Sequence, residues 1–313
     1  MKNDANVIVA EDLRKYYGDT KAVDGVTLSV GQGEIFGMLG PNGAGKSTTI
    51  EMLEGLRVAD AGAISVLGMR QPQDAQKIKG RIGIQLQTTA LYPRLTVTEI
   101  LDLFHAFFPA RQTLSTDELI RLVDLDEKRN TRSKQLSGGQ KQRLSVALAL
   151  VNDPEIVFFD EPTTGMDPQA RRQLWDVIGD LRRRGKTILL TTHYMEEADQ
   201  LCDRLAIMDH GKILALDTPA GLKASVGADS IVTVHALGDL NELSALLQQE
   251  VAGVISVNQV DNSLQVHVKG ASSIVPPIVT VAERGGFLLQ DLSVAEPTLE
   301  TVFINLTGKE LRD

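Results

Sequence analysis

The sequence has little cysteine and no long apolar stretch. Its 313 residues include one cysteine, Cys202, so we expect neither an internal disulfide nor a cysteine-based zinc site, and a reducing compartment fits. No apolar run approaches the ~18 residues of a membrane-spanning helix. The opening residues MKNDANVIVA also lack the apolar core of a secretory leader. A membrane role would therefore depend on a partner.

Basic residues are outnumbered by acidic ones, and this limits the kinds of partner. The formal net charge is −9, which argues against non-specific binding to nucleic acid, since that depends on Lys and Arg neutralising phosphates. Nucleotide binding stays open, because a local nest of backbone amides can hold a phosphate on an acidic protein. Two-thirds of the net charge falls on the residues from Lys223 onward. That shift predicts a domain boundary near 222, giving domains 1–222 and 223–313.

Segments of strand and helix character alternate over the first ~220 residues, which is typical of an α/β fold. The expected strands are 26–30, 34–39, 64–67, 82–86, 156–159 and 187–192, with a hairpin formed by 205–209 and 212–215. The expected helices are 46–56, 96–108, 137–151 and 168–184. Phe104, Phe107 and Phe108 could line a partner-binding groove, but core packing is the preferred interpretation. We expect helices to dominate a subdomain at about 88–150.

The final third of the chain has a different order of elements. We expect strands at 231–236, 254–260, 264–268 and 288–294 and helices at 240–250 and 273–284, with a last helix from Pro297 to about Leu306. This βαββαβ order predicts a small α+β domain of the ferredoxin-like type.

The strongest motif is GPNGAGKST, which matches the pattern G-x4-G-K-[ST] of a phosphate-binding loop. It follows an expected strand and opens an expected helix, which is the context the pattern needs. Its glycines allow successive N–H groups to converge on a phosphate, the lysine reaches the outer phosphates, and the serine ligates Mg²⁺. The candidate nucleotide-binding residues are Gly40, Pro41, Asn42, Gly43, Ala44, Gly45, Lys46, Ser47 and Thr48.

A second acidic motif ends a buried strand. Asp160 and Glu161 follow four apolar residues, at the end of the strand where an open α/β sheet places its ligand groups. In P-loop proteins an Asp in this position holds Mg²⁺, usually through water, so Asp160 and Ser47 are candidate metal ligands. Glu161 could orient and polarise an attacking water. A third motif, LSGGQ, caps the helix after Leu136 with Ser137, Gly138, Gly139 and Gln140, forming a second helix N-terminus suited to an anion. The residues alone leave a simple capping motif open here.

These motifs together resemble the ATP-binding cassette (ABC) family, in its order and spacing, over residues ~7 to ~220. The resemblance implies a P-loop NTPase core of RecA-like fold, ATP and Mg²⁺ as ligands, and hydrolysis of ATP to ADP and phosphate. It further implies that Gln87 contacts the metal and the water, that Asp167 is the D-loop aspartate, and that His193 contacts the γ-phosphate. By the same resemblance Tyr17 stacks on adenine, although the neighbouring Tyr16 could take that role instead. His193 could also be a histidine buried in the core without a catalytic role.

The resemblance also implies how the cassette works. It predicts a head-to-tail dimer in which Ser137, Gly138 and Gly139 close over the nucleotide held by Lys46 of the other subunit. The run after His193 and the ending EPTLETVFINLTG are similar to cassettes of bacterial drug, antibiotic or sodium exporters. We therefore expect separate integral membrane permease subunits as partners, at the cytoplasmic face of the membrane, and no nucleic acid. The alternative functions are a soluble cassette acting in translation or DNA repair, or a regulatory ATP-binding module. The dimer could contain two copies of this chain or one copy paired with another cassette.

Overall fold

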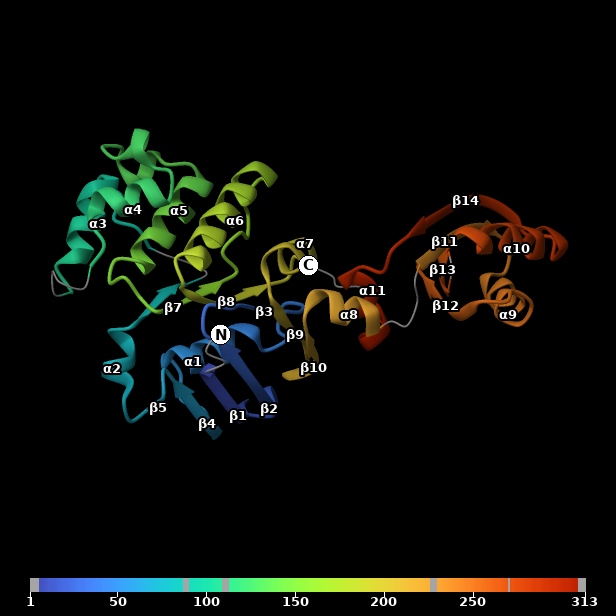
Figure 1. Ribbon diagram of the computed structural model, residues 1–313, viewed down its shortest axis with the longest axis horizontal. Coiled ribbons are helices and arrows are strands. Elements are labelled where there is room, and N and C mark those ends of the chain that lie inside the picture. Colours follow the sequence, from blue (N-terminus) through green and yellow to red (C-terminus); the bar gives the residue numbers. More distant parts are fainter. Residues whose placement is uncertain (1–5, 87–89, 109–112, 226–229, 270, 309–313) are drawn as a thin grey trace. The chain divides into compact units, whose positions relative to one another are not determined.

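The computed structural model describes residues 6–86, 90–108, 113–225, 230–269 and 271–308 (Figure 1). The chain divides into two compact units beside Pro219. The larger unit is Met1–Pro219 together with Leu311–Asp313, and the smaller unit is Ala220–Glu310.

The larger unit is built on a six-stranded sheet with the order β10-β9-β3-β8-β7-β6. Five of these strands are parallel, and β10 pairs antiparallel with β9 at one edge. Their bounds are β3 (Ile35–Leu39), β6 (Ile82–Gln85), β7 (Ile156–Asp160), β8 (Thr187–Thr192), β9 (Arg204–Asp209) and β10 (Lys212–Asp217). Every residue of β3, β7 and β8 is buried, as expected for parallel strands covered on both faces. Their carboxyl ends therefore meet at one edge of the sheet.

A second sheet packs on the same core. Its order is β2-β1-β4-β5 and all its pairs are antiparallel. The strands are β1 (Asn6–Tyr17), β2 (Thr20–Gly31), β4 (Ala61–Val66) and β5 (Met69–Gln71). One cluster of buried apolar side chains, including Ile8 from β1, Val26 from β2, Phe36 from β3 and Phe158 from β7, joins the two sheets.

The helices of the larger unit form two groups. The helix α1 (Lys46–Glu54) packs against both sheets, and the helices α3, α4 and α5 pack on one another, with α5 also in contact with β6 (Figure 1). The other bounds are α2 (Ala75–Lys79), α3 (Val97–His105), α4 (Thr116–Leu122), η2 (Asp126–Lys128), η3 (Ser133–Gln135), α5 (Gly138–Ala149), α6 (Pro168–Arg183) and α7 (Met195–Leu201). Thr96 and Glu99 form a capping box at the start of α3.

The prediction that Phe107 belongs to the core of the helical group is wrong. The helix α3 ends at His105, earlier than the expected Phe108. Phe107 therefore lies beyond the helix and is 71% exposed, with its ring at the edge of the Phe104 ring, 5.9 Å between centroids.

The helix α8 (Pro219–Ser225) begins at the last residue of the Met1–Pro219 segment of the larger unit and continues into the smaller one. The other elements of the smaller unit are β11 (Ser230–Leu237), α9 (Leu240–Glu250), β12 (Val254–Val260), β13 (Ser263–Val268), α10 (Ala271–Arg284), β14 (Leu288–Ala295) and α11 (Leu299–Thr307). Its antiparallel sheet has the order β12-β13-β11-β14. Side chains from α9 and α10 share one apolar core with this sheet. Among the described residues of both units, no helix is long and apolar enough to cross a membrane.

Candidate functional site

The site is built around the loop between β3 and α1. Gly43 and Gly45 both have positive φ angles, of 83° and 98°, which glycine adopts without steric cost. A Cβ on Gly45 would lie 2.3 Å from the carbonyl oxygen of Ala22, and one on Gly40 would lie 2.2 Å from that of Met208. The glycines are therefore required by close backbone approach, and the loop is held firmly at the start of α1.

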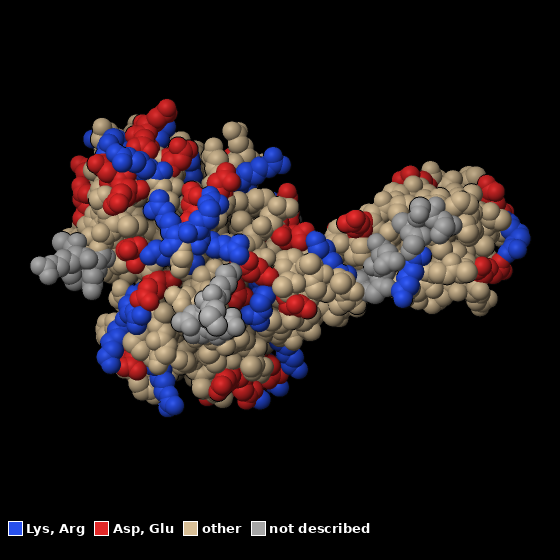
Figure 2. Space-filling model, viewed as in Figure 1, with Lys and Arg blue, Asp and Glu red and all other residues tan. Residues whose placement is uncertain are grey.

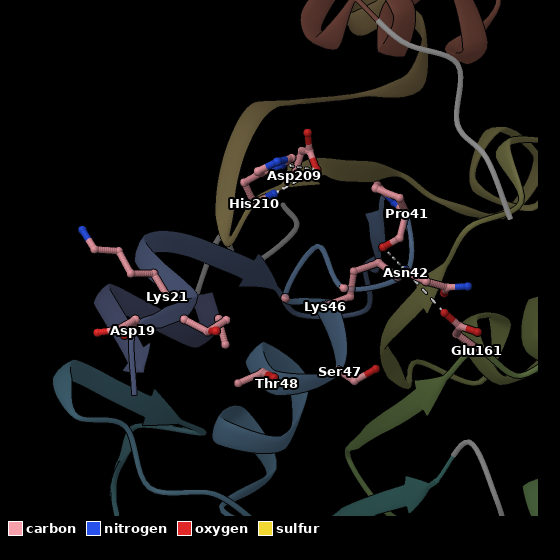
Figure 3. A pocket seen from close by; sticks show the side chains of 14 residues that line it. Asp19, Lys21, Pro41, Asn42, Lys46, Ser47, Thr48, Glu161, Asp209 and His210 are labelled. Atoms are coloured by element: carbon pink, nitrogen blue, oxygen red, sulfur yellow. Dashed lines mark hydrogen bonds and ion pairs between the residues drawn. The ribbon is translucent and has the colours of Figure 1, made fainter. Parts of the chain in front are cut away.

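A cavity of about 960 Å³ opens beside this loop (Figure 3). The loop contributes Pro41, Asn42, Gly43, Gly45, Lys46, Ser47 and Thr48 to its lining, and Glu161 contributes from the end of β7. Sequence reasoning missed the remaining lining residues, which are Asp19, Thr20, Lys21 and Ala22 around the β1–β2 turn and Asp209 and His210 at the β9–β10 turn. No motif spacing connects those two turns to the loop. The hydrogen bond from Gly211 N to Ala44 O (3.0 Å) shows that the β9–β10 turn lies against it.

Lys46 is the buried cation of the cavity. Its Nζ donates to the carbonyl oxygens of Gly40 (2.7 Å) and Pro41 (3.1 Å) and lies 3.4 Å from Oε1 of Glu161. Burial lowers the pKa of Lys46, and the Glu161 carboxylate opposes that effect. The protonated form of Lys46 is therefore stabilised in this position by nearby negative charge.

Asp160 and Ser47 form a pair of oxygen ligands next to Lys46. The Ser47 hydroxyl donates to Oδ1 of Asp160 at 3.1 Å, and the Thr191 hydroxyl donates to the same atom. Burial raises the pKa of Asp160, so a cation beside this carboxylate would stabilise its ionised form. In the part of the chain that the structure describes, no group of three or more His, Cys, Asp or Glu residues could hold a metal. A hydroxyl and a carboxylate nevertheless fit Mg²⁺, which takes few protein ligands and completes its shell with phosphate and water oxygens.

The Glu161 carboxylate has three neighbours, Lys46, Thr164 and His193. Its carboxylate accepts a hydrogen bond from the Thr164 hydroxyl (3.1 Å), and Oε2 is 3.3 Å from Nδ1 of His193. Burial would raise the pKa of Glu161, but Lys46 and His193 outweigh burial and the pKa is lowered. The carboxylate is therefore ionised at neutral pH, in the form that can accept a proton from water.

The LSGGQ motif, which begins α5, lies elsewhere in the unit. Ser137 and Gln140 form a capping box, with Ser137 Oγ accepting from Gln140 N at 3.2 Å. None of the motif's residues lines the cavity at Lys46. Gly138 is exposed, and a Cβ there would meet nothing within 4 Å. The helix N-terminus is therefore available to a ligand from outside this subunit's own cavity.

Two further predicted site residues, Asp167 and Tyr17, are absent from the lining of the cavity. Asp167 caps α6, with Oδ1 accepting from Ala170 N at 2.9 Å. Tyr17 is 44% exposed and does not line the cavity; its ring lies 5.4 Å from the guanidinium carbon of Arg57. Gln87 lies outside the described residues.

The comparisons with known proteins agree with one another. The model of the ABC transporter family matches residues 23–164. The linearmycin resistance ATP-binding protein of Bacillus subtilis (strain 168) is 36% identical over 98% of this chain and 100% of its own length. A Nod factor export ATP-binding protein of Paraburkholderia xenovorans (strain LB400) is 40% identical over 97% of each chain. A solved dimeric ATP-binding cassette, in a post-hydrolysis state with ADP and phosphate, is 26% identical with a TM-score of 0.61, covering 67% of this chain and 98% of its own.

Proposed function

This chain belongs to the ABC transporter family, and from that premise we propose how its residues divide the work of an exporter's ATPase subunit. The chain is the ATP-binding and ATP-hydrolysing subunit of a bacterial exporter of this family. The observation that carries the assignment of roles is one cavity that brings together the Gly40–Thr48 loop, the Ser47–Asp160 pair and the Glu161 carboxylate.

The loop holds the phosphates of ATP. Its backbone N–H groups and the N-terminus of α1 converge on the β- and γ-phosphates, and Lys46 Nζ exchanges its contact with Glu161 for a phosphate oxygen. Ser47 and Asp160, with Gln87, would hold Mg²⁺. When bound, the ion neutralises negative charge that develops on the phosphates.

Glu161 is the general base for the attacking water. Its carboxylate is ionised, and exchange of Lys46 to phosphate would leave Oε1 able to accept a proton from that water. Nδ1 of His193 lies 3.3 Å from Oε2 of Glu161. With a proton on both ring nitrogens, His193 would donate from Nε2, on the other edge of the ring, to the γ-phosphate.

Closure of two subunits completes the site. Ser137, Gly138, Gly139 and Gln140 would donate the N-terminus of α5 to the γ-phosphate held by the other subunit, since they do not line their own subunit's cavity. Asp167, at the start of α6, would meet the partner's site. Closing the interface excludes water and strengthens the field on the phosphate. Tyr17 would stack on adenine.

Export requires membrane partners. We expect ATP-driven closure to move separate integral membrane permease subunits, with this chain peripheral at the cytoplasmic face. The element order β11-α9-β12-β13-α10-β14 and the sheet order β12-β13-β11-β14 support a ferredoxin-like fold for the smaller unit. Its proposed role is to contribute contacts to the dimer.

The test is the variant Glu161→Gln, which keeps the shape of the side chain and removes the base. Purified protein should bind ATP within about 2-fold of the unmodified affinity, while turnover falls by about 100-fold or more. Glu196→Gln, an exposed position on α7, is the matched control and should keep normal turnover. Near-normal hydrolysis by Glu161→Gln would overturn the assignment of the base.

A further inference from the structure

Three aromatic or planar side chains form a stack that ends at Glu161. The guanidinium carbon of Arg171 lies 4.0 Å from the centre of the Tyr194 ring. The Tyr194 ring lies 4.1 Å, between centroids, from the imidazole of His193, with the planes inclined by 45°. Nδ1 of His193 is in turn 3.3 Å from Glu161. The stack therefore connects the proposed base to a helix outside the cavity.

That helix is α6, which begins immediately after Asp167. Arg171 and Trp175 are four residues apart and so lie on one face of α6. Arg171 contacts the Tyr194 ring, and Trp175 Nε1 donates to Glu197 Oε1 on α7 at 3.0 Å. Two successive turns of α6 are thus fixed against the segment that carries His193. These contacts form a continuous path from the start of α6 to the imidazole.

The guanidinium of Arg171 contacts the Tyr194 ring, and its charge also acts on the Glu197 carboxyl of α7. Its Nε is buried and has no hydrogen-bond partner within the described part of the chain, although a guanidinium usually uses its N–H groups on carboxylates or carbonyls. A cation over the face of tyrosine is attracted by the ring's quadrupole. The stack therefore holds the guanidinium of Arg171 against the face of the Tyr194 ring.

The imidazole needs such support because, among the described residues, its ring has one polar contact, the one with Glu161. His193 follows the last residue of β8 and precedes the first turn of α7. Its contact with Glu161 involves one ring atom, which restricts position but leaves rotation about that atom possible. A ring packed against its face removes that freedom. The same packing fixes where Nε2 points.

We propose that Tyr194 and Arg171 are positioning residues that hold the His193 imidazole in the orientation needed for ATP hydrolysis. This proposal rests on the proposed role of His193 in the same site. Tyr194 acts on the reaction through His193, and Arg171 acts through Tyr194. Because Arg171 is one turn from Asp167, the orientation of the imidazole follows the position of the helix that the dimer interface would contact.

A purely structural contact between α6 and α7 predicts a different result from a positioning role. Losing a structural contact lowers stability without a selective effect on turnover. Losing a positioning contact lowers kcat with little change in KM, because a misplaced group weakens the transition state more than the ground state. The ring of Tyr194, and not its hydroxyl, makes both contacts in the stack, so phenylalanine should replace it.

The experiment measures ATP turnover of the full chain with the variants Tyr194→Ala, Tyr194→Phe and Arg171→Met. For Tyr194→Ala we expect kcat to fall about 10- to 100-fold with KM changed by less than about 2-fold. Tyr194→Phe should recover most of the turnover. The kcat of Arg171→Met should lie between those of Tyr194→Ala and Tyr194→Phe. The matched control is Arg172→Met, at an exposed neighbouring position on α6, which should behave as the unmodified chain. Fluorescence of the single tryptophan, Trp175, confirms folding, and Tyr194→Leu replaces Tyr194→Ala if the alanine variant unfolds.

The decisive comparison is in a His193→Ala background, with residual hydrolysis followed over long incubations. If Tyr194 acts through His193, adding Tyr194→Ala should cause no further loss. An equal loss in both backgrounds, or failure of Tyr194→Phe to recover turnover, would overturn the positioning role. Full hydrolysis by His193→Ala alone would instead overturn the proposed role of His193, so the two failures are distinguishable.

Discussion

Glu54 carries a carboxyl group buried in the larger unit, and this group makes the stability of the fold depend on pH. It ends α1, is 1% exposed, and neither of its carboxyl oxygens has a hydrogen-bond partner within the described residues. Burial, together with the charges of Asp160 and Glu51, raises the pKa of Glu54 from 4.5 to about 8. The folded chain therefore holds a proton on Glu54 that the unfolded chain releases near pH 4.5.

The sign and size of the effect follow from this difference. A pKa raised by folding gives stability that is present below the unfolded pKa and is lost as the pH rises through the folded pKa. Each pKa unit corresponds to about 1.4 kcal/mol. Between pH 5 and pH 8 Glu54 should therefore cost the fold on the order of 3 kcal/mol.

The perturbation is Glu54→Gln, which keeps the shape and cannot ionise. Urea unfolding followed by Trp175 fluorescence at pH 5, 7 and 8 should show that the unfolding free energy of the variant gains on the unmodified chain by about 3 kcal/mol from pH 5 to pH 8. A constant penalty from the buried amide does not alter this slope. Glu127→Gln, exposed in η2, is the control and should show no gain. Parallel pH profiles for Glu54→Gln and the unmodified chain would refute the reasoning.

Two further variants test other parts of the account. Tyr17→Ala should raise the KM for ATP by about 10-fold, since base stacking is worth roughly 1–3 kcal/mol. Tyr16→Phe should change this KM little. Equal KM values for the two variants in steady-state kinetics would argue against stacking by Tyr17. A chain ending at Leu222 should self-associate more weakly in the presence of ATP if the smaller unit contributes dimer contacts, and unchanged sedimentation would contradict that role.

Local sequence signals were sufficient where one residue type meets one requirement. The glycines of the GPNGAGKST motif predicted a tight loop between a strand and a helix, and the structure has that loop, with positive φ at Gly43 and Gly45. The expected strand 187–192 coincides with β8, and the expected helix 240–250 coincides with α9. Periodicity and capping are local properties, so the sequence carries them directly.

Tertiary relationships were not predictable in the same way. The long strand β1 was not expected, because its register is set by pairing with β2 and β4. His210 lines the cavity only because the β9–β10 turn lies against the loop at Ala44. The stack from Arg171 to His193 depends on how α6 packs beside α7, which no spacing in the sequence encodes.

The central claim is that one catalytic site needs residues from two subunits, and complementation between two inactive variants tests it most directly. Lys46→Ala removes the phosphate-binding lysine, and Ser137→Arg blocks the N-terminus of α5; each variant alone should form an inactive homodimer. In a mixed dimer one composite site keeps both Lys46 and Ser137. We predict that mixing restores hydrolysis to roughly a quarter of the unmodified rate, as half the dimers are mixed and each has one intact site. No recovery of hydrolysis, with mixed dimers shown to form, would contradict the account.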